Sequence, residues 1–328
     1  MGPVGARPRR ADHVRVVIVG AGVAGLTAAG ALDARGHDVL VLDKGRSPGG
    51  RMATRRIGDA TFDHGAQFFT VRGAPFAAQV AAWEAEGIVR VWCHGFVSGG
   101  DGYPRYIGAR GMSAIAKHMA VGLDVRCGAM AFAIRRGPGG QGWEVIVDDG
   151  TVHPADAIVS TCPLPQTFSL LFEAGVDLPR DLIAADYDRT IALLAVLDGP
   201  SAVPSPGGLQ QPDGIFSFVA DNALKGISAV PAVTLHADSA WSAHHWDHAR
   251  PAVHDALTEA ARPWLGSARV VDSQVKRWRF ATPRTPWPDP CWVAPEGSLV
   301  VAGDAFAGPK IEGAFGSGLA AAAALTGA

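Results

Sequence analysis

The chain has 328 residues, of which 48% are hydrophobic, so it is long enough for about two domains with buried cores. Its 29 basic and 31 acidic side chains give a net charge of −2, which favours neither a nucleic acid nor a membrane surface as a partner. The four cysteines are scattered and form no C-x-x-C pair, which argues against a redox-active dithiol and a structural zinc. We expect a cytoplasmic protein in which residues 1–12 are a flexible leader, because they lack the apolar run of a signal peptide.

Residues 14–43 predict one βαβ unit. Residues 14–19 form an apolar, β-branched run that is typical of a buried parallel strand. A glycine-rich turn over 20–25 follows, and then a helix over 26–35 that should end at Gly36 in a left-handed conformation. Residues 39–42 predict the second strand, and Asp43 stands at its end.

The rest of the chain divides into two groups of elements. One group has helices over 76–86 and 112–120, a Gly-rich loop over 92–104, a strand over 125–135 that turns through 137–142 into 143–147, and buried strands over 157–160 and 299–302. In the other group, strand-like runs over 191–197, 215–219 and 232–236 alternate with Pro/Gly turns and a helix over 253–261, as in an antiparallel sheet with a helix. We predict a discontinuous α/β domain over 13–75, 100–162 and 291–328, with an inserted domain over 76–99 and 163–290.

The glycine-rich turn has the G-x-G-x-x-G spacing of a dinucleotide-binding site, with a strand before it and a helix after it. Gly20 allows the tight turn, Gly22 lets the backbone approach a pyrophosphate, and Gly25 lets helix and strand pack closely. Free N–H groups and the dipole at the start of the helix favour the phosphates. Asp43, eighteen residues after Gly25, can accept hydrogen bonds from ribose hydroxyls.

A second cluster follows at Gly49-Gly50-Arg51-Met52. It resembles the FAD domain of the monoamine-oxidase-like superfamily, in which the glycines and the arginine lie along the pyrophosphate. An arginine there can make a forked, charge-assisted contact. This resemblance implies that the dinucleotide is FAD and that Gly50, Arg51 and Met52 lie beside it.

Further motifs are similar to those of the renalase family, especially its bacterial members. They keep their order and spacing over nearly the whole chain after residue 13: Gly65-Ala66-Gln67-Phe68, Gly111-Met112-Ser113-Ala114, Leu235-His236-Ala237, Trp241-Ser242, Arg277-Trp278, Gly303-Asp304, Glu312-Gly313-Ala314 and Ser317-Gly318. Two departures are Phe69, where related proteins often carry Tyr, and a shortened loop over 200–208. The resemblance implies an α/β fold with a two-dinucleotide-binding-type FAD domain, like that of p-hydroxybenzoate hydroxylase, and an inserted α+β substrate domain.

The resemblance also implies which residues contact a non-covalently bound FAD. Gly303 would let the chain pass tightly, so that Asp304 reaches the ribityl or pyrophosphate region. The final helix, predicted to start near Ala314 with Glu312 and Gly313 just before it, would aim its N-terminus at the flavin N1–C2=O edge, where negative charge develops on reduction. The other implied contacts are Ala24, Lys44, Arg51, Gln67 and Phe68, together with Ala131, whose backbone would meet the adenine.

The candidates on the substrate side are Phe68, Asn222, His236, Trp278 and Phe280. Trp278 and Phe280 alternate on a strand-like run over 276–281, so both face one side and can flank a planar ring. Two interpretations stay open, because both side chains are equally compatible with a place in the core. His236 is likewise compatible with a strand histidine that plays no part in the chemistry.

Three rival sites are weaker. His244 and His248 have the i, i+4 spacing of metal ligands, but no Glu completes H-E-x-x-H, and Pro251 limits the helix, so a solvated face is favoured. Ser317 lacks the strand–elbow–helix context of a nucleophile. The position of Cys291 does not match the flavin-attachment cysteine of amine oxidases.

The resemblance to renalases implies oxidation of the 2- and 6-dihydro isomers of NAD(P) to NAD(P)⁺, with hydride transfer to flavin N5 and return of the electrons to O₂ as H₂O₂. Such a hydride donor becomes aromatic and needs little acid–base help, which agrees with a sequence in which no His–acid pair stands out. The partners would be a dihydronicotinamide dinucleotide and O₂, and both a monomer and a homodimer stay open. The alternatives are an amine oxidase or desaturase of the same superfamily, and a non-catalytic flavin-binding protein.

Overall fold

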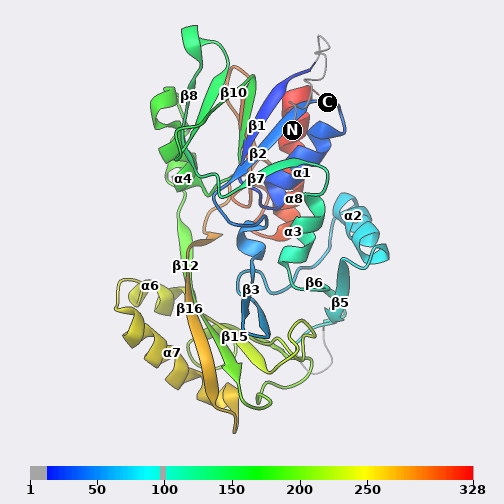
Figure 1. Ribbon diagram of the computed structural model, residues 1–328, viewed down its shortest axis with the longest axis vertical. Helices are drawn as coiled ribbons and strands as arrows, with labels where there is room; N and C mark the ends of the chain where they lie inside the picture. Colours follow the sequence, from blue (N-terminus) through cyan, green and yellow to red (C-terminus); the bar gives the residue numbers. More distant parts are fainter. Residues whose placement is uncertain (1–12, 97–100, 328) are drawn as a thin grey trace, which may run out of the picture.

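The computed structural model describes residues 13–96 and 101–327, so the predicted leader lies outside the described residues. Figure 1 shows an elongated molecule with two parts, each built on a sheet. One part holds a six-stranded sheet with helices α1 and α8, and the other holds a five-stranded sheet with helices α6 and α7. Within these ranges, no helix combines the length and the apolar character that a membrane crossing requires.

The six-stranded sheet forms the centre of the first part and has the order β17-β18-β11-β1-β2-β7. Its bounds are β1 (Arg15–Val19), β2 (Asp38–Asp43), β7 (Asp124–Cys127), β11 (Ala157–Ser160), β17 (Trp292–Val293) and β18 (Leu299–Val301). All neighbours are parallel except β17 and β18. Val16, Val17 and Ile18 are buried, as expected for the central strand of a parallel sheet that is covered on both faces.

Helices and a smaller sheet cover the six-stranded sheet. Helix α1 (Val23–Asp33) packs against α8 (Ile311–Thr326) and α3 (Ser113–Met119). The antiparallel sheet β10-β9-β8, with β8 (Ala131–Arg136), β9 (Trp143–Val147) and β10 (Val152–Ala155), shares a core with the other face. Helix α4 (Leu164–Leu171) lies against β8, and α5 (Arg180–Ile183) follows it.

The five-stranded sheet of the second part is antiparallel, with the order β13-β14-β15-β12-β16. Its bounds are β12 (Tyr187–Leu197), β13 (Gly208–Gln210), β14 (Phe216–Asp221), β15 (Ala232–Ala237) and β16 (Val270–Pro283). Helix α7 (Arg250–Leu265) packs on one face through Val253, Leu257 and Ala261, and α6 (Ser239–His244) precedes it. The hairpin β3 (Thr54–Ile57) and β4 (Ala60–Asp63) packs against Leu194 and Ala232.

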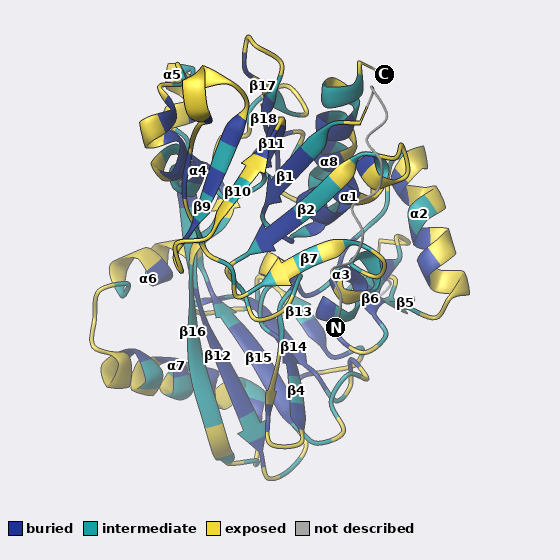
Figure 2. Ribbon diagram, turned by 45° about the horizontal axis from the view of Figure 1, so that its top comes forward, coloured by how far each residue is buried: buried dark blue, intermediate teal, exposed yellow. Residues whose placement is uncertain are grey.

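Figure 2 shows that the strands of both sheets are largely buried or half-buried, whereas α2, α6 and α7 carry many exposed residues. Helix α2 (Ala74–Ala85) and strands β5 (Val89–Cys93) and β6 (Arg105–Gly108) lie at one side of the molecule. Phe76, Val80 and Trp83 of α2 are buried in the same core as the strands of the six-stranded sheet.

Three predicted elements are corrected by the structure. The run 125–135 is two strands, β7 and β8, which lie in different sheets because the chain turns at Gly128 with a φ of +72°. The predicted loop over 92–104 begins later, because β5 continues to Cys93. The final helix begins at Ile311 and not near Ala314, so the three residues 312–314 lie in its first turn.

We propose that the two predicted domains exist but that their boundaries differ from the predicted ones, because three segments pack against the sheet of the other domain. Segments 76–93 and 164–183 were predicted in the inserted domain, yet their apolar side chains pack into the two cores beside the six-stranded sheet. The hairpin over 54–63 was predicted in the first domain, yet Ile57, Ala60 and Phe62 pack against the five-stranded sheet. We propose that each of these segments belongs with the sheet that buries it.

Candidate active site

The glycine-rich turn places the start of α1 at the end of β1. Gly22 is the N-cap of α1, no side chain caps this helix end, and a Cβ at Gly22 would have nothing within 4 Å. The first N–H groups of a helix lack partners inside the helix, so this open space suits an anion. Gly25 differs, because a Cβ there would lie 1.9 Å from the Gly20 carbonyl oxygen. Gly25 therefore serves the packing of the turn, and Ala24 lies buried between the two glycines.

Asp43 connects this turn to the next segment of the chain. Its two carboxylate oxygens accept hydrogen bonds from the Ala21 and Gly45 N–H groups, both at 2.6 Å. Its backbone oxygen accepts from the Ala129 N–H at 3.0 Å, two residues before Ala131 opens β8. A carboxylate has about four acceptor positions, so two remain for ribose hydroxyls beside the predicted adenine segment.

The second glycine cluster closes over the first. Gly49 N–H donates to the Ala21 oxygen at 2.8 Å, and a Cβ at Gly50 would lie 3.7 Å from Gly22 Cα. The Arg51 guanidinium makes a forked contact with the Asp304 carboxylate, although 253 residues separate the two in the sequence. Met52, predicted beside FAD, is a core residue in the structure with 2% of its surface exposed.

The first turn of α8 lies next to this cluster. The Glu312 carboxylate accepts from the Arg72 N–H at 3.0 Å and also from Gly73, the N-cap of α2, so it joins α8 to α2. A Cβ at Gly313 would lie 2.2 Å from the Gly308 oxygen, and Ala314 is half-buried. Ser317 Oγ accepts from the Gly303 N–H at 2.8 Å, which fixes the turn that carries Asp304. Lys44, in contrast, is exposed.

These features fit the phosphate half of FAD. An uncapped helix end faces open space, two glycine segments meet above it, and an arginine and an acid from opposite ends of the chain lie together. Arg51 also donates to the backbone oxygens of Phe280 at 3.2 Å and Ala281 at 3.4 Å, which joins the cluster to β16.

Four of the five substrate-side candidates, all except Phe280, lie in or around one short segment, residues 63–68, which we call the 63–68 loop. Trp278 Nε1 donates to the His64 backbone oxygen at 2.7 Å, and His236 Nε2 lies 3.1 Å from the same oxygen. The Trp278 ring stacks on the His64 ring, with centroids 5.2 Å apart. Because a carbonyl oxygen only accepts, His236 must carry its proton on Nε2, which leaves Nδ1 as an acceptor.

His64 and His236, which meet at the His64 backbone oxygen, are both neutral at pH 7. Burial lowers the pKa of His236 to about 4. Burial also lowers the pKa of His64 to about 4, and the positive charge of Lys276 adds to the effect. Neither imidazole is therefore a general acid at neutral pH.

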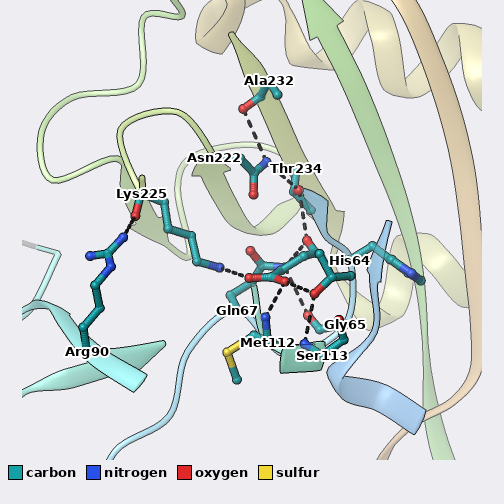
Figure 3. A network of polar contacts seen from close by, with 12 residues as sticks. His64, Gly65, Gln67, Arg90, Met112, Ser113, Asn222, Lys225, Ala232 and Thr234 are labelled. Atoms are coloured by element: carbon teal, nitrogen blue, oxygen red, sulfur yellow. Dashed lines mark hydrogen bonds and ion pairs between the residues drawn. The ribbon is translucent and has the colours of Figure 1, made fainter. Parts of the chain in front are cut away.

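A buried ion pair holds the first residue of the 63–68 loop, and Figure 3 draws it with the surrounding hydrogen bonds. Lys225 Nζ lies 2.7 Å from Asp63 Oδ2, and neither side chain has any exposed surface. Asp63 Oδ1 accepts from Thr54 Oγ1 at 2.6 Å and from the Met112 N–H at 2.8 Å. Burial lowers the pKa of Lys225, whereas Asp63 acts in the opposite direction. The pair thus joins β4 and α3 to the loop after β14.

Two amides extend this network and each leaves one oxygen without a partner. Gln67 Nε2 donates to the Asp63 backbone oxygen at 2.7 Å, and its Oε1 is buried without a partner. Asn222 Nδ2 donates to Thr234 Oγ1 at 3.0 Å, and its Oδ1 is also buried without a partner. Buried unpaired acceptors are rare, so they mark places where a bound donor or water is expected.

Phe68 faces a group of aromatic rings and not the histidines. Its ring lies 5.1 Å from that of Phe96 and 5.8 Å from that of Phe218, and Trp92 lies 5.0 Å from Phe96. The Arg105 guanidinium lies 5.5 Å from the Phe68 centroid and pairs with Asp101. Phe280 departs from the other candidates, because its ring packs against Tyr187 at 5.5 Å in the core beside the six-stranded sheet.

The histidines near α6 and Cys291, which were weighed as rival sites, have surroundings of a different kind. The His245 ring stacks on Trp241 at 3.9 Å, and the rings of His244 and His248 lie 5.6 Å apart. Within residues 13–96 and 101–327, no three His, Cys, Asp or Glu side chains are grouped to hold a metal ion. Cys291 is a free, half-buried thiol.

Sequence reasoning missed several residues of this site. Asp63 and His64 directly precede the Gly65-Ala66-Gln67-Phe68 motif, so their position gave a usable signal. Lys225 and Arg105 gave none, because a single basic residue outside any motif is normally a solvated side chain.

Sequence comparisons relate two consecutive segments of the chain to known families. Residues 18–83 match the family described as NAD(P)-binding Rossmann-like domain, and residues 87–326 match the family described as Flavin containing amine oxidoreductase. Hydroxyneurosporene desaturase of Rubrivivax gelatinosus is 52% identical over 58 residues, which are 18% of this chain and 11% of that protein. 4,4'-Diapophytoene desaturase of Staphylococcus haemolyticus is 46% identical over 50 residues, which are 15% of this chain and 10% of that protein. The chain therefore matches about a tenth of the length of these curated relatives.

Solved structures share the fold over nearly the whole chain. A candidate protoporphyrinogen oxidase from Exiguobacterium sp. 255-15 superposes with a TM-score of 0.73 at 13% identity, covering 95% of this chain and 98% of that one. Putrescine oxidase with bound putrescine superposes with a TM-score of 0.69 at 15% identity, covering 96% of this chain and 99% of that one. The predicted α/β fold class is thereby confirmed.

Proposed function

Since the chain belongs to the flavin-containing amine oxidoreductase family and has FAD as its cofactor, we propose that it is a renalase-type oxidase of dihydronicotinamides. The substrates would be the 2- and 6-dihydro isomers of NAD(P), which lose a hydride and become NAD(P)⁺. When bound, FAD supplies the hydride acceptor and passes the two electrons to O₂, which takes up two protons to give H₂O₂.

The observation that carries this proposal is the charge around the 63–68 loop. The only carboxylate of this segment, Asp63, is neutralised by Lys225, and the Arg105 guanidinium beside Phe68 is itself paired with Asp101. The two histidines are neutral, because burial lowers the pKa of each to about 4. These residues offer no unpaired carboxylate to the ammonium form in which an alkyl amine is present at neutral pH, whereas a dinucleotide with a neutral dihydropyridine ring needs no such partner.

The chemistry of the donor agrees with the residues present. A dihydropyridine that loses hydride becomes an aromatic pyridinium, so no base has to remove a proton from the reacting carbon. The residues then have to hold a planar ring in position, which is a proximity effect. Trp278 is suited to this task, because its Nε1 hydrogen bond to the His64 oxygen fixes the ring beside the loop.

We propose the following cofactor contacts for non-covalent FAD. The helix end at Gly22 and Ala24 would bind the pyrophosphate, with Arg51 beside it, and Asp43 would accept from the adenosine ribose. Gln67 would meet the flavin through its unpaired Oε1, which accepts a hydrogen bond. Asp304 and the first turn of α8 would lie on the other side.

Anaerobic stopped-flow absorbance tests the proposal. We expect 6-dihydro-NAD or 2-dihydro-NAD to bleach the flavin band within seconds, and putrescine or benzylamine to leave it oxidised. Bleaching by the amines alone would refute the proposal in favour of an amine oxidase. A flavin that no dihydronicotinamide and no amine reduces would favour a desaturase or a non-catalytic flavoprotein.

A further inference from the structure

A pocket of about 370 Å³ lies between the start of α7 and the edge strand β16, outside the site described above. Arg250, Pro251 and His254 line it from the helix, and Gln274, Val275 and Lys276 line it from the strand. Strand β16 ends the five-stranded sheet, so its outer edge has no neighbouring strand and is open to a ligand.

Positive charge gathers around this pocket without acidic partners. Arg250 and Lys276 line it, and Arg55 of β3 reaches its rim by donating from Nε to Gln274 Oε1 at 2.8 Å. Within residues 13–96 and 101–327, none of these three cations forms a salt bridge, whereas nine other arginines pair with carboxylates: Arg15, Arg51, Arg105, Arg126, Arg135, Arg136, Arg262, Arg269 and Arg284.

The three cations are close enough to affect one another. Burial lowers the pKa of Lys276, and the charges of Arg55 and Arg250 lower it further. Asp255, whose side chain is 82% exposed, lies 3.3 Å from the outer nitrogen of His254. The inner nitrogen of His254 lies 2.7 Å from Ser273 Oγ. An anion bound here would relieve the mutual repulsion of the cations.

The start of α7 adds to this field. The helix has 16 residues, its N-cap is Ala249, and no side chain caps it. Its first N–H groups and its dipole therefore favour a negative charge near Arg250. The helix end and the unpaired cations are independent features, and both select an anion.

The pocket lies on the same strand as the proposed substrate site. Lys276 and Trp278 are two residues apart on β16, which places their Cα atoms roughly 7 Å apart and their side chains on one face of the strand. That spacing matches the reach from a nicotinamide ring to the phosphates of the same dinucleotide. We propose that this pocket binds the phosphates of the ADP half of the substrate, an inference that rests on the proposed function.

Calorimetric titration of the FAD-loaded enzyme with ADP tests the pocket without turnover. The Arg250→Gln variant should bind ADP at least roughly tenfold more weakly than the wild type, the loss expected for one charge-assisted contact. Arg262→Gln is the matched control, because Arg262 lies on the same helix but pairs with Glu259 on the exposed face. Equal ADP affinity in both variants, or no ADP binding by the wild type, would overturn the inference.

A kinetic comparison links the pocket to the substrate. The ratio of kcat/KM for 6-dihydro-NAD to that for 6-dihydronicotinamide riboside, which lacks phosphates, should fall roughly tenfold in Arg250→Gln. Turnover of both compounds with an unchanged ratio overturns the inference and leaves the proposed function intact. ADP binding that depends on Arg250, in an enzyme that oxidises neither compound, supports the phosphate site and overturns the proposed function.

Discussion

The buried pair of Asp63 and Lys225 allows a quantitative test of what stabilises the 63–68 loop. Lys225→Met keeps an unbranched apolar stem but leaves the Asp63 carboxylate at a place where neither side chain has exposed surface. Asp63 keeps its hydrogen bonds from Thr54 and Met112, so the charge stays partly solvated by the protein. Loss of one partner of a buried pair costs about 3–5 kcal/mol. At about 2 °C per kcal/mol for a chain of this size, the melting temperature should fall by roughly 6–10 °C.

Thermal unfolding of the FAD-loaded enzyme, followed by far-UV circular dichroism, measures this effect. Lys117→Met is the control, because Lys117 is exposed on α3 and its loss should change stability by about 0.5 kcal/mol or less. The double variant Asp63→Asn/Lys225→Met removes both charges and should recover at least half of the loss. If Lys225→Met unfolds at the wild-type temperature, or the double variant is less stable than Lys225→Met, the pair does not stabilise the fold as we infer.

Three further predictions concern the cofactor and substrate sites. The Gly22→Ala variant should fold normally but raise the Kd for FAD at least roughly tenfold. The Gly25→Ala variant should disrupt folding, because its Cβ would lie 1.9 Å from a carbonyl oxygen. Flavin fluorescence titration and circular dichroism of both variants separate the two roles. His236 has a pKa of about 4 when folded and about 6.5 when unfolded, so protonation favours the unfolded chain and stability should fall as the pH drops from about 6.5 to 4. In urea unfolding the His236→Gln variant should show a shallower fall, by up to about 1.4 kcal/mol per pH unit, and equal slopes would contradict the assignment. Trp278→Leu should retain FAD but slow flavin reduction by 6-dihydro-NAD at least roughly tenfold, and an unchanged rate constant in stopped-flow would remove Trp278 from the site.

The parts of the fold that were predictable depend on local signals. The first βαβ unit follows from a β-branched run, a glycine turn and a second apolar run, and the structure shows β1, α1 and β2 there. The break between β7 and β8 was missed, because the apolar pattern continues through Gly128 and only its positive φ interrupts the strand. The start of α8 was placed late, because Gly313 looks like a breaker but lies against the Gly308 oxygen.

The site shows the same division between local and long-range information. Arg51 and Asp304 were each predicted from short motifs, and the structure brings them together. The pair of Asp63 and Lys225 links positions 162 residues apart, and a buried charge pair leaves no pattern in a single sequence. Met52 is buried in the core, and an apolar side chain in a cofactor motif can equally serve the core.

The long ribbon formed by β12 and β16 has a mechanical consequence. The two strands pair from Leu197 and Val270 at one end to Tyr187 and Pro283 at the other, where Tyr187 packs in the core of the first part. This ladder of hydrogen bonds between the two parts resists bending, except where the register shifts between Asp188 and Thr190 and between Val196 and Leu197. We therefore expect the two parts to move as one body, so that small molecules reach the flavin by rearrangement of loops and not by a hinge that swings the parts apart.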